Sequence, residues 1–160
     1  MTQVDLAAVA IVVRRLCTGL AVEVAAVVPL VGNRWGAPML LAVGRSRDVV
    51  LSPARVLRAA LVVNATAVVL AHNHLDHSGP SPADHALTRR LVAAGAVLGV
   101  PLSGHLVVGP GGWFDCFERP STRRSYELAG AQDCASASAR AAVTRLFELE
   151  GARHDLRAVS

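Results

Sequence analysis

The sequence predicts an α/β (α+β) domain in which a mixed β-sheet is flanked by helices. Short apolar runs alternate with segments of helical spacing, which is the pattern of a layered sheet. The connections expected at 32–36 and 109–112 are short enough for hairpins, which indicates antiparallel as well as parallel pairing. The 160 residues are 52% hydrophobic and 18% charged, which suits one ordered domain. We expect that domain over 1–119, and over 120–160 a tail rich in Arg, Ser and Ala with a short helix.

Three helices are predicted in this domain. The first covers 4–16 and is followed by Gly19 as a C-cap. The second begins at Ser52-Pro53 and the third at Ser81-Pro82, because each pair places an N-cap residue before a proline at the first helical position. Gly99 ends the third helix. The positions expected to face the core are Val4, Ala8, Ile11 and Leu16 in the first, Val56, Leu57, Ala60 and Leu61 in the second, and Leu87, Leu91, Ala94 and Leu98 in the third.

The strands are predicted from apolar and β-branched runs between turn residues. The Val- and Ala-rich run 20–31 is a mostly buried strand, and 39–43 returns beside it after the turn at 32–36. The run 67–71 is the central strand of the sheet. The remaining strands are expected at 105–108 and 113–117.

Composition and charge exclude several classes of protein. The net charge is +4, and all 16 basic residues are arginines scattered along the chain, so nucleic-acid binding is possible but not indicated. No apolar run approaches the roughly 18–20 residues of a membrane span, and no basic segment precedes an N-terminal apolar run, so we expect a soluble, cytoplasmic protein. Cys17, Cys116 and Cys134 are widely spaced and odd in number, which argues against a disulfide framework.

The segment that carries chemistry is His72-Asn73-His74, directly after the strand predicted over 67–71. Histidines at i and i+2 point to the same side only where the backbone is extended. Asp84 lies in the first turn of the next predicted helix, from which its carboxylate can reach back to the histidines. Two imidazoles and a carboxylate, with a fourth position left for water, form a catalytic zinc arrangement. The pattern therefore predicts a Zn²⁺ site at His72, His74 and Asp84.

Each part of this pattern also has a simpler interpretation. A His-x-His pair in a loop is often no more than a surface feature. Ser81 and Asp84 fit a helix N-cap with an acidic residue at the third position, which needs no metal.

Glu23 is the second candidate for a role in chemistry. It stands among valines and alanines over 22–27, where burial of an unpaired carboxylate would cost several kcal/mol. The simpler interpretation is an edge-strand residue that faces solvent. The functional one is a desolvated general base with a raised pKa, close to the water on the metal.

Three segments together resemble the JAMM (JAB/MPN+) metalloprotease motif, and most closely its RadC-like branch. They are 70–74 (LAHNH), the SxxD pattern at 81–84 and 87–91 (LTRRL). Further similarity at 52–61, 98–100 and 105–109 extends the resemblance from about 20 to 118.

The resemblance implies a zinc-dependent hydrolase with the JAB/MPN (cytidine-deaminase-like) architecture. It implies that His72, His74 and Asp84 bind Zn²⁺, with water in the fourth position. Glu23 would be the catalytic acid/base. Ser81 would polarise the scissile carbonyl and hold the oxyanion.

The loop before Ser81 departs from the family pattern. It is one residue shorter than the usual HNHPSGD form. Asp76 and His77 therefore offer an alternative ligand, and His85 is another candidate beside the predicted carboxylate.

Two further departures concern the rest of the chain. Gly104 stands where an Asp commonly precedes the histidine of the later strand, which leaves the role of His105 open. The helical N-terminal half of RadC proteins is not seen, so we expect a stand-alone catalytic-type domain with an added tail.

Two functions of different classes follow. The first is a zinc metallopeptidase or isopeptidase that acts on a peptide or protein, including a ubiquitin-like conjugate. The second is a non-catalytic RadC-like module in DNA repair, recombination, mobile-element or defence systems. The joint presence of Glu23, His72, His74, Ser81 and Asp84 favours the enzyme. The sequence carries no indication of oligomeric state.

Overall fold

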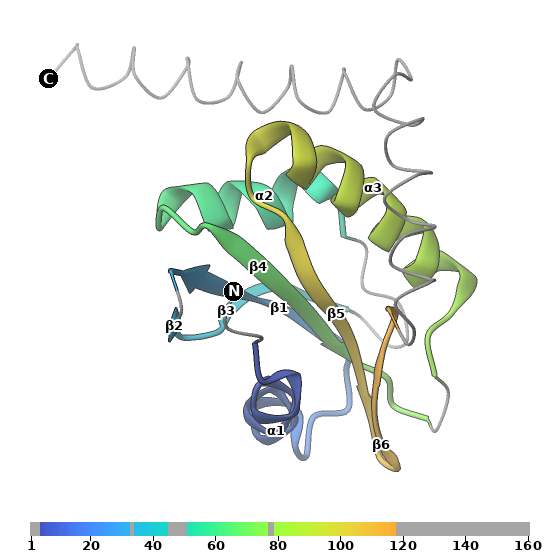
Figure 1. Ribbon diagram of the computed structural model, residues 1–160. Helices are drawn as coiled ribbons and strands as arrows, with labels where there is room; N and C mark the ends of the chain where they lie inside the picture. The colour runs from blue at the N-terminus through green and yellow to red at the C-terminus, as the bar shows by residue number, and fades with distance from the viewer. Residues whose placement is uncertain (1–3, 33, 45–50, 77–78, 118–160) are drawn as a thin grey trace, which may run out of the picture.

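The computed structural model describes residues 4–32, 34–44, 51–76 and 79–117 and is organised in three layers (Figure 1). A curled mixed sheet forms the middle layer, with one helix on one face and two on the other. The helices are α1 (Leu6–Cys17), α2 (Pro53–Val62) and α3 (Pro82–Leu98). The strands are β1 (Val24–Val31), β2 (Arg34–Trp35), β3 (Met39–Val43), β4 (Ala67–Asn73), β5 (Leu102–Gly109) and β6 (Gly112–Asp115). The predicted fold class is therefore confirmed.

The strand order β2-β1-β4-β5-β6 explains why the sheet is mixed. β1 runs antiparallel to β4, whereas β4 runs parallel to β5 and is joined to it through α3. A parallel pair needs such a crossover, because its two strands point the same way. β2 and β3 both pair antiparallel with the outer edge of β1, and β6 returns from β5 as a hairpin.

Each face of the sheet buries its own apolar cluster. The α1 face buries Val9, Ala10, Val13, Val28, Leu30, Val69, Ala71, Leu106 and Val108. The opposite face, under α2 and α3, includes Val27, Val56, Leu57, Leu70, Leu87, Leu91 and Phe117. Side chains alternate between the two faces along a strand, so β4 contributes to both clusters.

The predicted helix starts are confirmed. Ser52 caps α2 and Ser81 caps α3, each followed by proline, and Gly99 ends α3 in the left-handed conformation with φ +69°. The predicted core faces of α2 and α3 also hold, because Leu57 and Leu91 are almost fully buried.

The face predicted for α1 is wrong. Ile11 and Leu16 are 53% and 56% exposed, whereas Val9, Ala10 and Val13 face the sheet. The helix is apolar on nearly every side (LAAVAIVVRRLC), so hydrophobic spacing did not distinguish its buried face.

Several strand boundaries differ from those predicted. β1 begins at Val24 and not at residue 20, because the chain turns and bends over 18–22. β4 and β5 are longer than predicted, since pairing continues to Asn73 and begins at Leu102. A two-residue strand, β2, occupies part of the turn predicted at 32–36, and β6 ends at Asp115.

Some expectations lie outside the described residues. The tail and short helix predicted over 120–160, with Cys134, belong to this group. Cys17 and Cys116 are free cysteines. Within the described ranges, no helix is both long and apolar enough to cross a membrane.

Candidate metal centre

The three predicted ligands meet at one edge of the sheet because of the order and direction of its elements. His72 is the second-last residue of β4. His74 follows the end of the strand, where its amide N–H still bonds to the Val108 carbonyl at 2.9 Å. The backbone is therefore extended through both histidines. The chain then enters α3, whose first turn carries Asp84.

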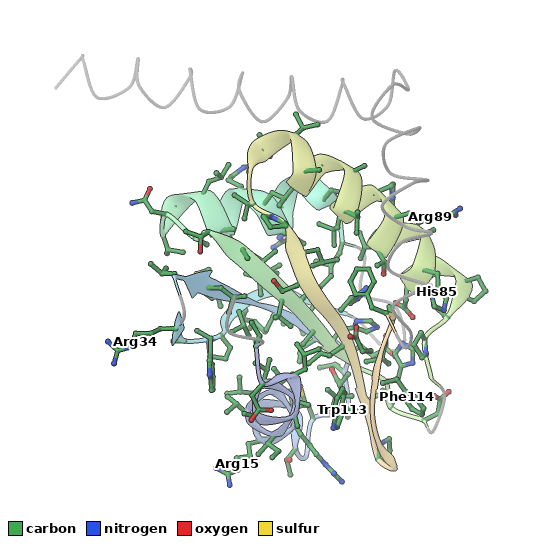
Figure 2. The ribbon with its side chains drawn as sticks, in the orientation of Figure 1. Arg15, Arg34, His85, Arg89, Trp113 and Phe114 are labelled. Atoms are coloured by element: carbon green, nitrogen blue, oxygen red, sulfur yellow. The ribbon has the colours of Figure 1, made fainter. Side chains whose placement is uncertain are left out.

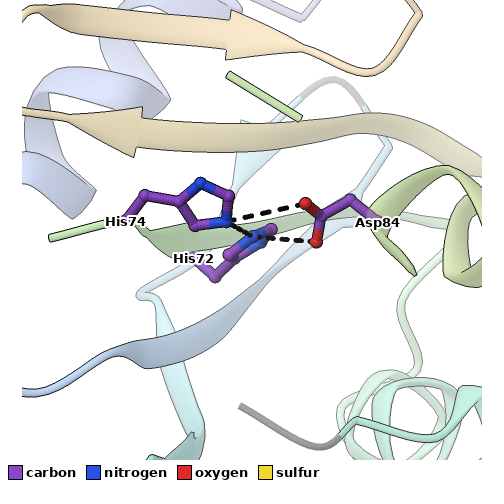
Figure 3. Close-up of side chains that lie close together, drawn as sticks. All are labelled: His72, His74 and Asp84. Carbon is purple, nitrogen blue, oxygen red and sulfur yellow. Dashed lines mark hydrogen bonds and ion pairs between the residues drawn. The ribbon is translucent and has the colours of Figure 1, made fainter. Parts of the chain in front are cut away.

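The ligand atoms of these residues converge in space. His72 Nε2 is 3.1 Å from His74 Nε2 and 3.0 Å from Asp84 Oδ1. His74 Nε2 is 3.5 Å from Asp84 Oδ2. Figure 3 shows both imidazoles pointing from β4 toward the carboxylate. Among the described residues, this is the group of His, Cys, Asp and Glu side chains that could hold a metal ion.

The spacing of these three residues is compatible with a bound metal ion. Zinc binds nitrogen at about 2.0–2.1 Å in a tetrahedron, so two of its ligand atoms stand about 3.3 Å apart. The separations from His72 Nε2, 3.1 Å to His74 Nε2 and 3.0 Å to Asp84 Oδ1, are close to this value, and one ligand atom from each of the three residues lies within 4.8 Å of the others. Two imidazole nitrogens and one carboxylate oxygen are also donors that zinc accepts. The residues therefore fit a metal ion held by two imidazoles and a carboxylate.

Asp84 is held in place by the N-terminus of α3. Its Oδ2 accepts hydrogen bonds from the Ser81 amide at 2.7 Å and the Ser81 hydroxyl at 2.6 Å, while its own amide donates to Ser81 Oγ. Asp84 therefore takes part in the helix N-cap and in the candidate metal site at the same time, although the sequence presented these as alternatives. Burial acts to raise the pKa of Asp84, but the hydrogen bond and charge of His72 and the two Ser81 donors outweigh it and lower that pKa below its usual range.

Glu23 lies close to this edge and is buried. It immediately precedes β1, which runs antiparallel to β4 and therefore starts where β4 ends. Ala25 pairs with His72, so the same register continued by two residues places Glu23 opposite His74. Its exposed fraction is 7%, which excludes the solvent-facing alternative. Its role as acid/base stays a prediction, as does the catalytic role of Ser81.

Asn73, which sequence reasoning left without a role, fixes the segment around Glu23. Its Oδ1 accepts from the Val24 amide at 2.6 Å, and its Nδ2 donates to the Val22 carbonyl at 3.2 Å. One side chain at the end of β4 therefore fastens the backbone on both sides of Glu23. The signal for it in the sequence was its position between the two histidines.

The structure also gives His105 a definite place. Val107 pairs with His72 in the parallel register, so His105 lies on the same face of the sheet, under α3. Its Nε2 is 3.3 Å from His72 Nδ1, and its Nδ1 is 2.7 Å from Thr88 Oγ1. Burial, followed by the charge of His72, lowers the pKa of His105 to about 3.

Gly104, where the family pattern has an acid, faces the other side of the sheet. A Cβ at this position would stand 2.8 Å from Leu6 Cδ2 of α1. The missing side chain is therefore explained by packing against α1, and it does not remove a partner from His105.

The alternative ligands differ in their placement. Asp76 is exposed, and His77 lies outside the described residues. His85 is half-buried and follows Asp84 on α3, next to Arg89 (Figure 2), but does not belong to the converging group.

Two features border the site. A pocket of about 230 Å³ reaches His74 and is lined also by Arg14, Asn73 and Leu75. On β6, Trp113 and Phe114 project to opposite sides of the strand (Figure 2), and the Phe114 ring lies against Gly79 in the loop before α3.

Comparison with known proteins gives a consistent result. A family model described as "RadC-like JAB domain" matches residues 5–120. The chain is similar to a UPF0758 protein of Alcanivorax borkumensis, with 48% identity over 68 residues, which is 42% of this chain and 30% of that protein. A UPF0758 protein of Trichormus variabilis is 37% identical over 82 residues, 51% of this chain and 34% of that protein. The chain thus matches about a third of the length of these curated relatives.

Proposed function

The chain belongs to the RadC-like JAB domain family, and from this premise we propose that it is a zinc-dependent amide hydrolase, a metallopeptidase or isopeptidase of the JAMM type. The observation that carries the proposal is the convergence of one donor atom each from His72, His74 and Asp84 to within 4.8 Å of one another. A zinc ion bound there supplies a Lewis acid that ionises water near neutral pH.

Glu23 is the proton carrier in this proposal. Its buried carboxylate takes a proton from the attacking water and returns it to the nitrogen of the leaving amine. Both transfers require one group close to the water and to the scissile bond. The proposal is supported by the register of β1 and β4, which, continued by two residues beyond Ala25 and His72, sets Glu23 opposite His74.

In this proposal, Ser81 and the pocket beside His74 act on the substrate. The Ser81 hydroxyl bonds to Asp84 Oδ2 and can turn from it to donate to the carbonyl oxygen as negative charge develops. The pocket beside His74 is of a size to receive one side chain of a peptide substrate. The proposed substrates are peptides or proteins, including ubiquitin-like conjugates.

The test combines metal analysis with an assay of amide cleavage on a peptide library and on ubiquitin-like conjugates. We expect one zinc per chain and cleavage that a chelator abolishes. Glu23→Gln keeps the side-chain shape but cannot carry a proton, so it should retain zinc and lose activity by about 10²-fold or more.

Asp76→Asn is the matched control, because it removes an exposed carboxylate from the loop that follows the two histidines. It should leave both zinc and rate close to those of the wild type. A protein without zinc would favour the non-catalytic RadC-like module. Loss of zinc in Glu23→Gln would instead make Glu23 a ligand.

A further inference from the structure

A chain of hydrogen bonds leads from α3 through β5 to the metal centre. Thr88 Oγ1 is 2.7 Å from the Asp84 carbonyl oxygen and 2.7 Å from His105 Nδ1. The other nitrogen of that ring, His105 Nε2, is 3.3 Å from His72 Nδ1. Thr88 and His105 are both fully buried. The rings involved are neighbours on β4 and β5, with the His72 and His105 centroids 5.2 Å apart.

The direction of each bond in this chain can be worked out from its first member. A carbonyl oxygen has no proton, so the Thr88 hydroxyl must donate its single hydrogen to Asp84 O. Toward His105 the hydroxyl can then only accept, and His105 must carry its hydrogen on Nδ1.

The tautomer of His105 in turn determines that of His72. With its single hydrogen on Nδ1, the imidazole of His105 has a lone pair on Nε2. That nitrogen accepts from His72 Nδ1, which must therefore carry a hydrogen. The lone pair that remains to His72 for a metal is on Nε2, the atom that faces His74 and Asp84.

We propose that Thr88 and His105 are positioning residues that set the hydrogen on His72 Nδ1 and so direct the Nε2 lone pair to the metal. The inference rests on the zinc site proposed above. A ligating histidine generally donates its second N–H to an acceptor that fixes its ring. Here that acceptor is a second histidine, and the threonine decides which nitrogen of the second histidine can accept.

Thr88→Val tests this directly, because valine keeps the shape and removes the hydroxyl. Without the acceptor at residue 88, His105 can move its hydrogen to Nε2 and donate to His72 Nδ1, which leaves the hydrogen of His72 on Nε2, bonded to Asp84. Zinc binding then requires both His72 and His105 to move their hydrogens back to Nδ1. The Nδ1–H of His105 is left buried against valine, which has no acceptor for it. We expect zinc affinity, measured by chelator competition, to fall by about 10–100-fold.

Two controls separate this effect from general damage. Thr88→Ser restores a hydroxyl and should restore the affinity. Thr66→Val makes the same chemical change at a threonine that bonds to the Leu30 carbonyl and the Gly32 amide. Thr66 stands just before β4, at the end of the strand opposite the site, so this variant should leave zinc affinity unchanged.

A spectroscopic measurement does not depend on folding energy or on activity. In ¹⁵N-labelled, metal-free protein, long-range ¹H–¹⁵N NMR should place the His105 hydrogen on Nδ1 in the wild type and in Thr88→Ser, and on Nε2 in Thr88→Val. If Thr88→Val does not fold, His105→Gln, which keeps a donor and an acceptor, should bind zinc more tightly than His105→Leu.

The outcomes distinguish this inference from the proposed function. A wild-type His105 hydrogen on Nε2, or equal zinc affinity in Thr88→Val and Thr66→Val, would overturn the positioning role and leave the zinc site standing. The expected tautomers in a protein that binds no zinc would support the hydrogen-bond chain and contradict the proposed function.

Discussion

The two faces of the sheet are packed on different principles. Beneath α1 lies an apolar cluster, and Gly104 leaves room there for Leu6. Under α3 the apolar cluster gives way, toward the carboxyl end of β4, to a buried polar group that includes His72, His105 and Thr88.

This difference shows what burial of polar groups requires. Thr88 and His105 are fully buried, yet each has hydrogen-bond partners on a neighbouring element. A buried polar group without a partner costs roughly 1–3 kcal/mol. The α3 face therefore carries its buried polar groups as a connected set, whereas the α1 face is mainly apolar and borders the site through Asn73 and the pocket beside His74.

The largest expected effect is on the α3 face. His74→Ala removes one of the three proposed ligands and should abolish stoichiometric zinc in a purified sample. His85→Ala, at a half-buried histidine outside the converging group, is the control and should keep the metal. Unchanged zinc in His74→Ala would assign the site to other residues, such as His77.

The pH dependence of stability should also come mainly from the α3 face. His105 has a pKa of about 3 when folded, below its usual value of about 6.5. The unfolded chain therefore binds a proton first, and stability that is complete above about pH 6.5 is lost as the pH falls toward 3. The slope should approach about 1.4 kcal/mol per pH unit in metal-free protein, and Asp84 acts in the same direction below about pH 4.

Urea unfolding of metal-free protein at a series of pH values measures this slope. His105→Gln should flatten it between pH 6.5 and 4, whereas His85→Gln should not. Equal slopes in the wild type and His105→Gln would show that His105 is not held neutral by the fold.

Core truncation should separate the two faces. Leu91→Ala opens a cavity beneath α3 and should cost about 2–5 kcal/mol in urea unfolding. Because α3 carries Asp84 and Thr88, zinc affinity should fall as well. Val9→Ala, in the cluster beneath α1, should lower stability and leave zinc affinity unchanged. A weaker zinc site in both variants would mean that the faces are coupled.

A smaller effect is expected from Gly104→Ala. The added methyl meets Leu6 Cδ2 at 2.8 Å, so the leucine must move, at a cost of about 1–3 kcal/mol. Since residue 104 points away from His105, we expect thermal unfolding to shift and zinc binding to stay constant. A change in zinc affinity would contradict the separation of the faces.

The sequence predicted local features whose causes are local. Ser52-Pro53 and Ser81-Pro82 mark helix starts because a cap needs only its own next turn, and His72 and His74 share a side because alternation is a property of one strand. The start of β1 and the buried face of α1 were not predicted correctly. Both depend on which apolar residues meet across the sheet, which spacing within an apolar run does not encode.

The sequence predicted that His72, His74 and Asp84 come together, but it did not predict the residues that support them. Asn73, Thr88 and His105 act through partners 17 to 51 residues away, so no short motif joins them. The doubt about His105 came from its neighbour Gly104, and the alternation of the strand removes it because the two residues face opposite layers.

Anomalous scattering at the zinc edge, from crystals of the protein purified with equimolar zinc, tests the central claim most directly. The account predicts one anomalous peak at about 2.0–2.2 Å from His72 Nε2, His74 Nε2 and one carboxylate oxygen of Asp84. A peak on other residues such as His77 or His85, or no peak at all, would contradict it.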